Sequence, residues 1–154
     1  MLHFDRLFHV VIFLMTALVT QDGRADQAKY LVESKVVLSR GTVAISEVSR
    51  RGNISRLRLT GPKGTGVGEA ILPLFDVINK IAAIRKTSHF VILKDTDSSE
   101  RSAEYVVGFT NSASPEISSE FGRDFPAKMS DGSPRHVFSV KEVNEMLSVF
   151  GATK

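Results

Sequence analysis

Hydrophobic and polar residues alternate along much of the chain with the period of two that marks β-strands. Between residues 54 and 59, Leu57 and Leu59 fall on one side and Arg56 and Arg58 on the other, the pattern of a strand with one buried face. Further segments rich in Val, Ile, Thr and aromatic residues also favour strands. These segments are residues 35–39, 42–48, 89–94, 101–110 and 136–140. A short polar turn after residue 94 favours an antiparallel hairpin between two of them.

A helical period replaces this alternation after the glycine-rich segment 61–68. Apolar residues then recur on one face of a 3.6-residue period. They are Ile71, Leu74, Phe75, Ile78, Ile81 and Ala82. Because proline lacks the N–H that a helix interior uses, Pro73 predicts a helix that begins near residues 70–72 and continues to about 86.

A second helix is expected over residues 140–150, where Ser139 and Glu142 have the spacing of a capping box. The irregular segment 111–134, rich in Ser, Gly and Pro, is expected to be a loop. Strands and amphipathic helices of these lengths indicate an α+β fold. We expect a mostly antiparallel sheet of five or six strands with two helices packed on one face.

The first 25 residues have the pattern of a signal peptide. The apolar run 10–19 is followed by a polar stretch with the small residues Gly23 and Ala25, which predicts cleavage before Asp26. An uncleaved anchor and a core helix are the alternatives. The run is shorter than the roughly 20 residues that span a bilayer. We therefore expect a signal peptide at 1–25, a single α+β domain at 26–154, and a periplasmic or secreted location.

The composition removes several classes of chemistry. The chain has no cysteine, which excludes disulfides, thiolate metal sites, cysteine nucleophiles and an acylated-cysteine anchor. A hydrophobic content of 42% excludes a wholly disordered chain. A net charge of +3 is too small to argue for nucleic acid, and we expect no nucleic-acid partner.

Two motifs resemble catalytic or ligand sites without completing them. Asp95 and Asp97 follow a hydrophobic strand as in the D-x-D box of aspartyl-phosphate phosphatases, but an acidic hairpin turn is the simpler interpretation. The glycines of 61–68 precede a helix, yet the residues that lead into this helix are Gly68-Glu69-Ala70, where a phosphate-binding loop has Gly-Lys-Ser/Thr. We expect no cofactor and no metal, with Asp95 and Asp97 as the weak metal candidates.

One basic segment is the strongest charge asymmetry in the chain. It holds five bases with no acid between them: Arg50, Arg51, Arg56, Arg58 and Lys63. If strand 54–59 alternates, the side chains of Arg56 and Arg58 lie on its solvent side. The segment predicts a positive patch for an anionic partner, either an envelope surface or an acidic protein. A solvated strand face is the simpler interpretation.

Residues 81–95, with an Ala-Ala helix end, a short turn and the strand Phe90-Val-Ile-Leu93, resemble small proteobacterial envelope proteins. Many of those are lipoproteins, although the acylated cysteine is missing here. The resemblance implies an envelope location and no particular chemistry.

The sequence thus favours an exported, non-enzymatic binding protein of unknown ligand. A small hydrolase or metal-dependent phosphatase using Asp95 and Asp97 is one alternative. A structural or assembly subunit that pairs through sheet edges is the other.

Overall fold

The computed structural model describes residues 31–38, 41–63, 65, 67–96 and 102–149. The chain divides into two units, 1–31 and 32–154, and the account below concerns the described residues of the second. The expected signal peptide lies outside the described residues.

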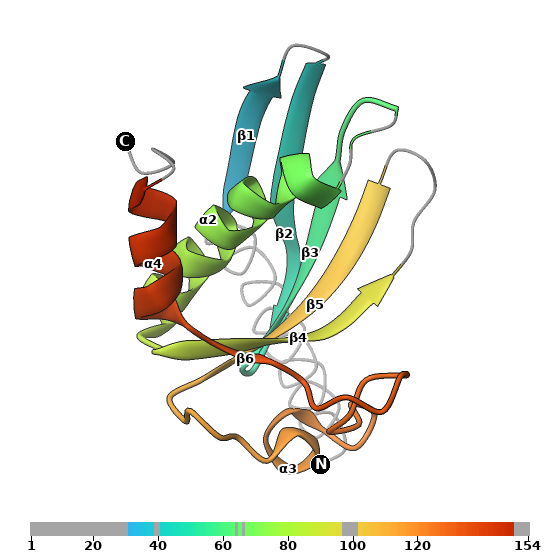
Figure 1. Ribbon diagram of the computed structural model, residues 1–154, viewed down its shortest axis with the longest axis vertical. Coiled ribbons are helices and arrows are strands. Elements are labelled where there is room, and N and C mark those ends of the chain that lie inside the picture. The colour runs from blue at the N-terminus through green and yellow to red at the C-terminus, as the bar shows by residue number, and fades with distance from the viewer. Residues whose placement is uncertain (1–30, 39–40, 64, 66, 97–101, 150–154) are drawn as a thin grey trace, which may run out of the picture. The chain divides into compact units, whose positions relative to one another are not determined.

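The second unit is an α+β domain, as predicted, built on one six-stranded sheet (Figure 1). Every pair of neighbouring strands is antiparallel, in the order β1-β2-β3-β5-β4-β6. The strands are β1 (Glu33–Leu38), β2 (Gly41–Arg51), β3 (Ile54–Thr60), β4 (His89–Thr96), β5 (Ser102–Thr110) and β6 (Val137–Ser139). The helices are α2 (Val67–Arg85), α3 (Ile117–Phe121) and α4 (Val140–Val149).

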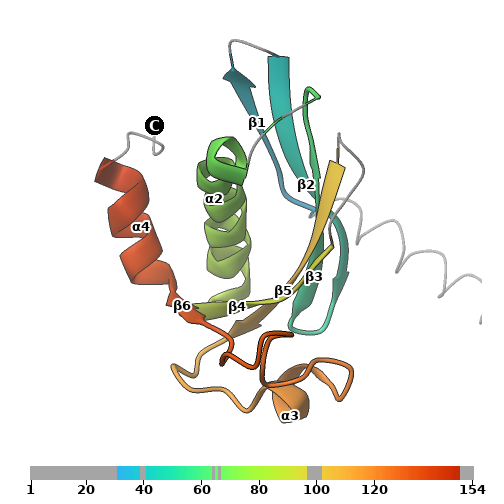
Figure 2. The same ribbon diagram turned by 45° about the vertical axis from the view of Figure 1, so that its right-hand side comes forward.

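The sheet curls around α2, and α4 packs beside α2 on the same side (Figure 2). We call this side the inner face. It carries the main core, in which Ile45 and Leu57 of the sheet meet Ile78 and Ile81 of α2 and Leu147 of α4. All five side chains are almost fully buried. The two long helices therefore cover one face of the sheet, as the apolar stripes predicted.

A second, smaller core lies on the opposite side, which we call the outer face. Val91 and Leu93 of β4 pack there against Ile117 and Phe121 of α3. The segment 111–134 was expected to be a loop. Instead it contains α3, whose first turn is capped by Glu116: the carboxylate accepts a hydrogen bond from the Ser119 N–H at 2.7 Å.

The long helix begins earlier than predicted. It starts at Val67, which places Pro73 inside the helix rather than at its first position. Proline has no backbone N–H, so the helix lacks one hydrogen bond at this position. The Pro73 ring is buried. Ile71, assigned to the buried stripe from its spacing, is 39% exposed, because the inner face of the helix runs through Ala70, Leu74 and Val77 instead.

Candidate binding groove

A β-bulge in β2 decides which of two neighbouring arginines points to the inner face of the sheet. Glu47 is opposite Leu57 of β3, but Ser49 is opposite Arg56, so Val48 is an extra residue. An extra residue exchanges the faces of all side chains that follow it. Arg50 consequently lies opposite the buried Ser55 on the inner face, whereas Arg51, one residue later, is exposed.

Arg50 neutralises a buried carboxylate. Its Nε and Nη2 donate to the two carboxylate oxygens of Glu47 at 2.9 and 2.5 Å, and the Ser55 hydroxyl donates at 2.6 Å. Burial by itself raises the pKa of Glu47. The hydrogen bonds from Arg50 and Ser55, the charge of Arg50 and the Val32 N–H together outweigh burial and hold that pKa below its usual range.

Arg85, at the end of α2, completes this buried polar cluster. Its guanidinium donates to the Gly52 carbonyl, to the Ile54 carbonyl at 3.1 Å and to the Ser55 hydroxyl at 2.8 Å. It also lies 4.9 Å from the centre of the Phe109 ring, a cation–π distance. Burial lowers the pKa of Arg85, as does the charge of Arg50. Arg85 thereby ties the β2–β3 turn to the helix.

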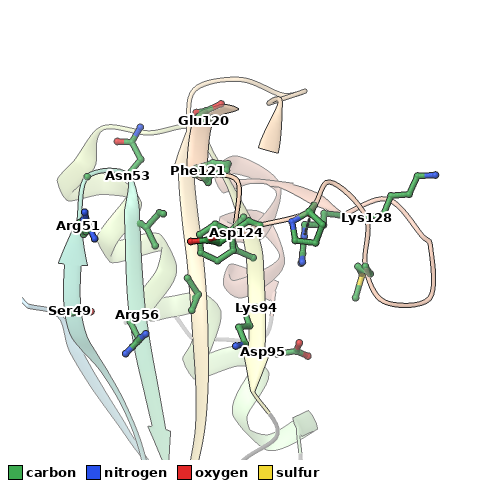
Figure 3. A pocket seen from close by; sticks show the side chains of 18 of the residues that line it. Ser49, Arg51, Asn53, Arg56, Lys94, Asp95, Glu120, Phe121, Asp124 and Lys128 are labelled. Carbon is green, nitrogen blue, oxygen red and sulfur yellow. Dashed lines mark hydrogen bonds between the residues drawn. The ribbon is translucent and has the colours of Figure 1, made fainter. Parts of the chain in front are cut away.

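The outer face holds an open groove of about 1250 Å³ beside this turn (Figure 3). Arg51 and Arg56 project from β2 and β3 on one side, and Asp124 and Lys128 lie on the loop that faces them. Seven apolar residues also line the groove: Ile54, Leu93, Val106, Phe121, Phe125, Pro126 and Met129. The other lining residues, apart from Gly52, are polar or charged: Ser49, Asn53, Lys94, Asp95, Glu120, Ser130 and Arg135. The groove is therefore an apolar trough with charged rims.

The strand register aligns two bases across the groove. Arg56 of β3 and Lys94 of β4 are both opposite Val106 of β5, so their backbones lie about 10 Å apart with β5 between them. Arg51, Arg56 and Lys94 are exposed. Within the described part of the chain, none of the three forms an ion pair.

The five predicted binding residues are not brought together. Arg51 and Arg56 line the groove, and Arg50 is committed to Glu47 on the inner face. Arg58 is exposed as expected, but its Nε and Nη2 donate to Glu104 at 3.2 and 2.9 Å. Lys63 follows β3 at the end of the strand away from the groove. The basic segment thus divides among four places.

The acidic candidates are placed only in part. Asp95 is exposed near the end of β4 and lines the groove together with Glu120 and Asp124. Asp97 lies outside the described residues, as do Gly64 and Gly66 of the glycine-rich segment. Among the residues that the structure describes, no three His, Cys, Asp or Glu side chains gather in a way that suits a metal ion.

Sequence reasoning missed the residues contributed by the loop and by β4, chiefly Lys94, Phe121 and Phe125. It also missed Glu47, for which a signal existed: Glu47 has the same strand parity as Val43 and Ile45. An acid on a core face needs a buried partner, and Arg50 is three residues away. No comparable local signal marks Phe121.

Comparisons with protein-family models, with characterised proteins and with solved structures gave no match to this chain. No helix in the described residues has both the length and the apolar character needed to cross a membrane.

Proposed function

We propose that this chain is an exported, non-enzymatic binding protein that holds an acidic protein segment in the outer-face groove. The observation that carries the proposal is the set of exposed bases Arg51, Arg56 and Lys94, which lack a counter-ion among the described residues and border an apolar floor. Arginine binds carboxylates through paired, charge-assisted hydrogen bonds. The apolar floor buries apolar surface of the bound segment, which adds to the binding free energy of the ion pairs.

The shape and the charge of the groove both bear on the partner. A concave trough suits a chain segment better than the flat surface of a bilayer. Asp95, Glu120 and Asp124 share the lining with the bases, so these three carboxylates repel a uniformly negative polymer. A segment that combines acidic and apolar side chains matches both parts of the lining.

Alanine at both Arg51 and Arg56 is expected to weaken binding of a fluorescein-labelled Glu/Phe peptide by about tenfold or more, since two charge-assisted contacts are lost. The binding of the unsubstituted protein should also weaken between about 0.01 and 0.15 M salt, as the Debye length falls from about 30 to about 8 Å. Fluorescence anisotropy measures both effects.

Lys63→Ala is the matched control for that experiment. It removes a base of the same sequence segment that lies outside the groove, and it should leave the affinity unchanged. A loss equal to that of the double variant would favour a diffuse patch over the groove. Co-sedimentation with anionic vesicles that again requires the two arginines, without peptide binding, would assign the surface to a membrane instead.

Export is tested separately. The apolar run 10–19 and the small residues Gly23 and Ala25 support removal of residues 1–25. Protein isolated from the periplasm or medium of its host should have Asp26 as its first residue, measured by N-terminal sequencing. An intact Met1 in cytoplasmic protein would contradict this part of the proposal.

A further inference from the structure

We infer that the acidic segment binds as an extended strand that adds to the open edge of β4; this inference rests on the proposed function. β6 pairs with β4 at three positions, His89 to Val91, while β4 continues to Thr96. Beyond Val91, within the described residues, this edge is met by one group: Nη1 of Arg135, which donates to the Ile92 carbonyl at 3.1 Å. In the part of the chain that the structure describes, the last part of β4 is therefore a strand edge whose backbone has no further partner on this side.

One end of the groove borders this edge, since Lys94 and Asp95 of β4 belong to its lining. Leu93 has the strand parity of Val91 and points with it into the small outer core, where it is 1% exposed. The bulge between Ile92 and Lys94 then brings Lys94 to the same face, opposite Val106. Lys94 and Asp95 continue the edge beyond it, and Lys128 lies on the loop segment past β4 (Figure 3). A peptide strand placed there continues the line of β6 and pairs its main chain with β4, as in other cases of strand addition.

Charge and pattern select the occupant. Lys94 and Lys128 stand on the two sides of the proposed strand, and Met129, 46% exposed, offers an apolar contact beside them. Side chains of an added strand alternate between its two faces. Lys94, Lys128 and Met129 all line the outer-face groove, so only the side chains of the added strand that point to the outer face meet them. Acidic residues at every second position place their carboxylates on that face, beside the two lysines.

A second copy of this chain is a weaker match for the same edge. β1 is the opposite edge strand of the sheet, and its Val37 is 81% exposed. Its charges, however, are one acid and one base, Glu33 and Lys35, which pair with each other at 3.4 Å. β1 thus lacks the negative charge that would complement Lys94 and Lys128.

The test compares two synthetic peptides on the full-length mature protein. One alternates Glu with Val and Phe. The other has the same side chains but carries N-methyl groups on alternate residues, so that one edge of its backbone has no N–H to donate. We expect the methylated peptide to bind about tenfold or more weakly. Only the first peptide should shift the backbone amide resonances of Ile92 to Asp95. Lys94→Glu should weaken binding of the first peptide. Lys141→Glu, at an exposed position of α4, should leave this binding unchanged.

The outcomes separate the inference from the proposed function. If both peptides bind equally and both require Arg51 and Arg56, the groove function stands and strand addition is wrong. If neither peptide requires Lys94 or the arginines, the proposed function fails and the inference fails with it. If the first peptide requires Lys94 and its backbone N–H groups but not the arginines, strand addition at β4 stands and the proposed role of Arg51 and Arg56 is wrong. If the protein self-associates and Lys94→Glu abolishes the self-association, the occupant is a second copy, which overturns the acidic-peptide assignment.

Discussion

Replacing Glu47 with glutamine is expected to lower the free energy of unfolding by about 3 kcal/mol, because it leaves buried cations without their counter-ion. The Glu47 side chain is fully buried, and Arg50 retains 21% exposure, so Arg50 recovers some hydration. Arg85 is also affected: the charge of Arg50 lowers the pKa of Arg85, and the charge of Glu47 raises it. Urea unfolding of the two proteins measures the difference.

The control is the exposed pair of Arg58 with Glu104 on the outer face. Arg58→Ala should cost under about 1 kcal/mol, the usual range for solvated ion pairs. A variant with apolar residues at both Glu47 and Arg50 should recover part of the lost stability, since no charge then remains unpaired between them. Equal losses for Glu47→Gln and Arg58→Ala would show that the inner cluster is not a buried ion pair.

The same carboxylate gives the domain an acid-sensitive component of stability. The pKa of Glu47 in the folded protein is below its ordinary value of 4.5. A group with a depressed pKa stabilises the fold fully above its unfolded pKa, and this contribution disappears as pH falls through the folded value. The stability gap between wild type and Glu47→Gln should therefore be largest near neutral pH and shrink below about pH 4.5.

Phe121→Ala is expected to destabilise the protein by about 3–5 kcal/mol, the usual cost of truncating a buried phenylalanine. Phe121 is 5% exposed, and its ring occupies the space above Gly108 of β5. A β-carbon at Gly108 would lie 2.6 Å from that ring. Because the ring also anchors the loop that walls the groove, peptide binding should be lost together with stability. Urea unfolding and anisotropy report the two effects.

Gly108→Ala provides the complementary variant. Alone it should destabilise, since the new methyl group displaces the Phe121 ring. In the Phe121→Ala background the methyl group enters vacated space, so the two losses should sum to more than the loss of the double variant. Strict additivity would contradict the close packing of these two residues.

Local periodicity was sufficient for much of the architecture. The alternation of Leu57 and Leu59 with Arg56 and Arg58 predicted which side chains of β3 are buried, and the structure confirms it. The spacing of Ile78, Ile81 and Ala82 likewise predicted the buried face of α2. These patterns predict burial because the residues at every period of one element face the same environment, the core between the sheet and α2.

The binding groove depended on information that no single segment contains. Arg50 and Arg51 are adjacent and chemically identical, yet Arg50 is bound to Glu47 and Arg51 borders the groove. Neighbouring residues of a strand point to opposite faces in any case, but the bulge at Val48 makes Arg50, and not Arg51, the inward one. That bulge exists only in the register between β2 and β3.

The sequence by itself determined the fold class, the strand hairpins and the buried faces, because hydrophobic burial acts on periodic positions within each element. Only the tertiary structure decided which charges are paired and which remain available. The Phe121–Gly108 contact that places the loop joins residues thirteen positions apart through packing, and the pairing of Arg58 with Glu104 joins separate strands. Such contacts are set by shape and register between elements, which leave no period in the chain.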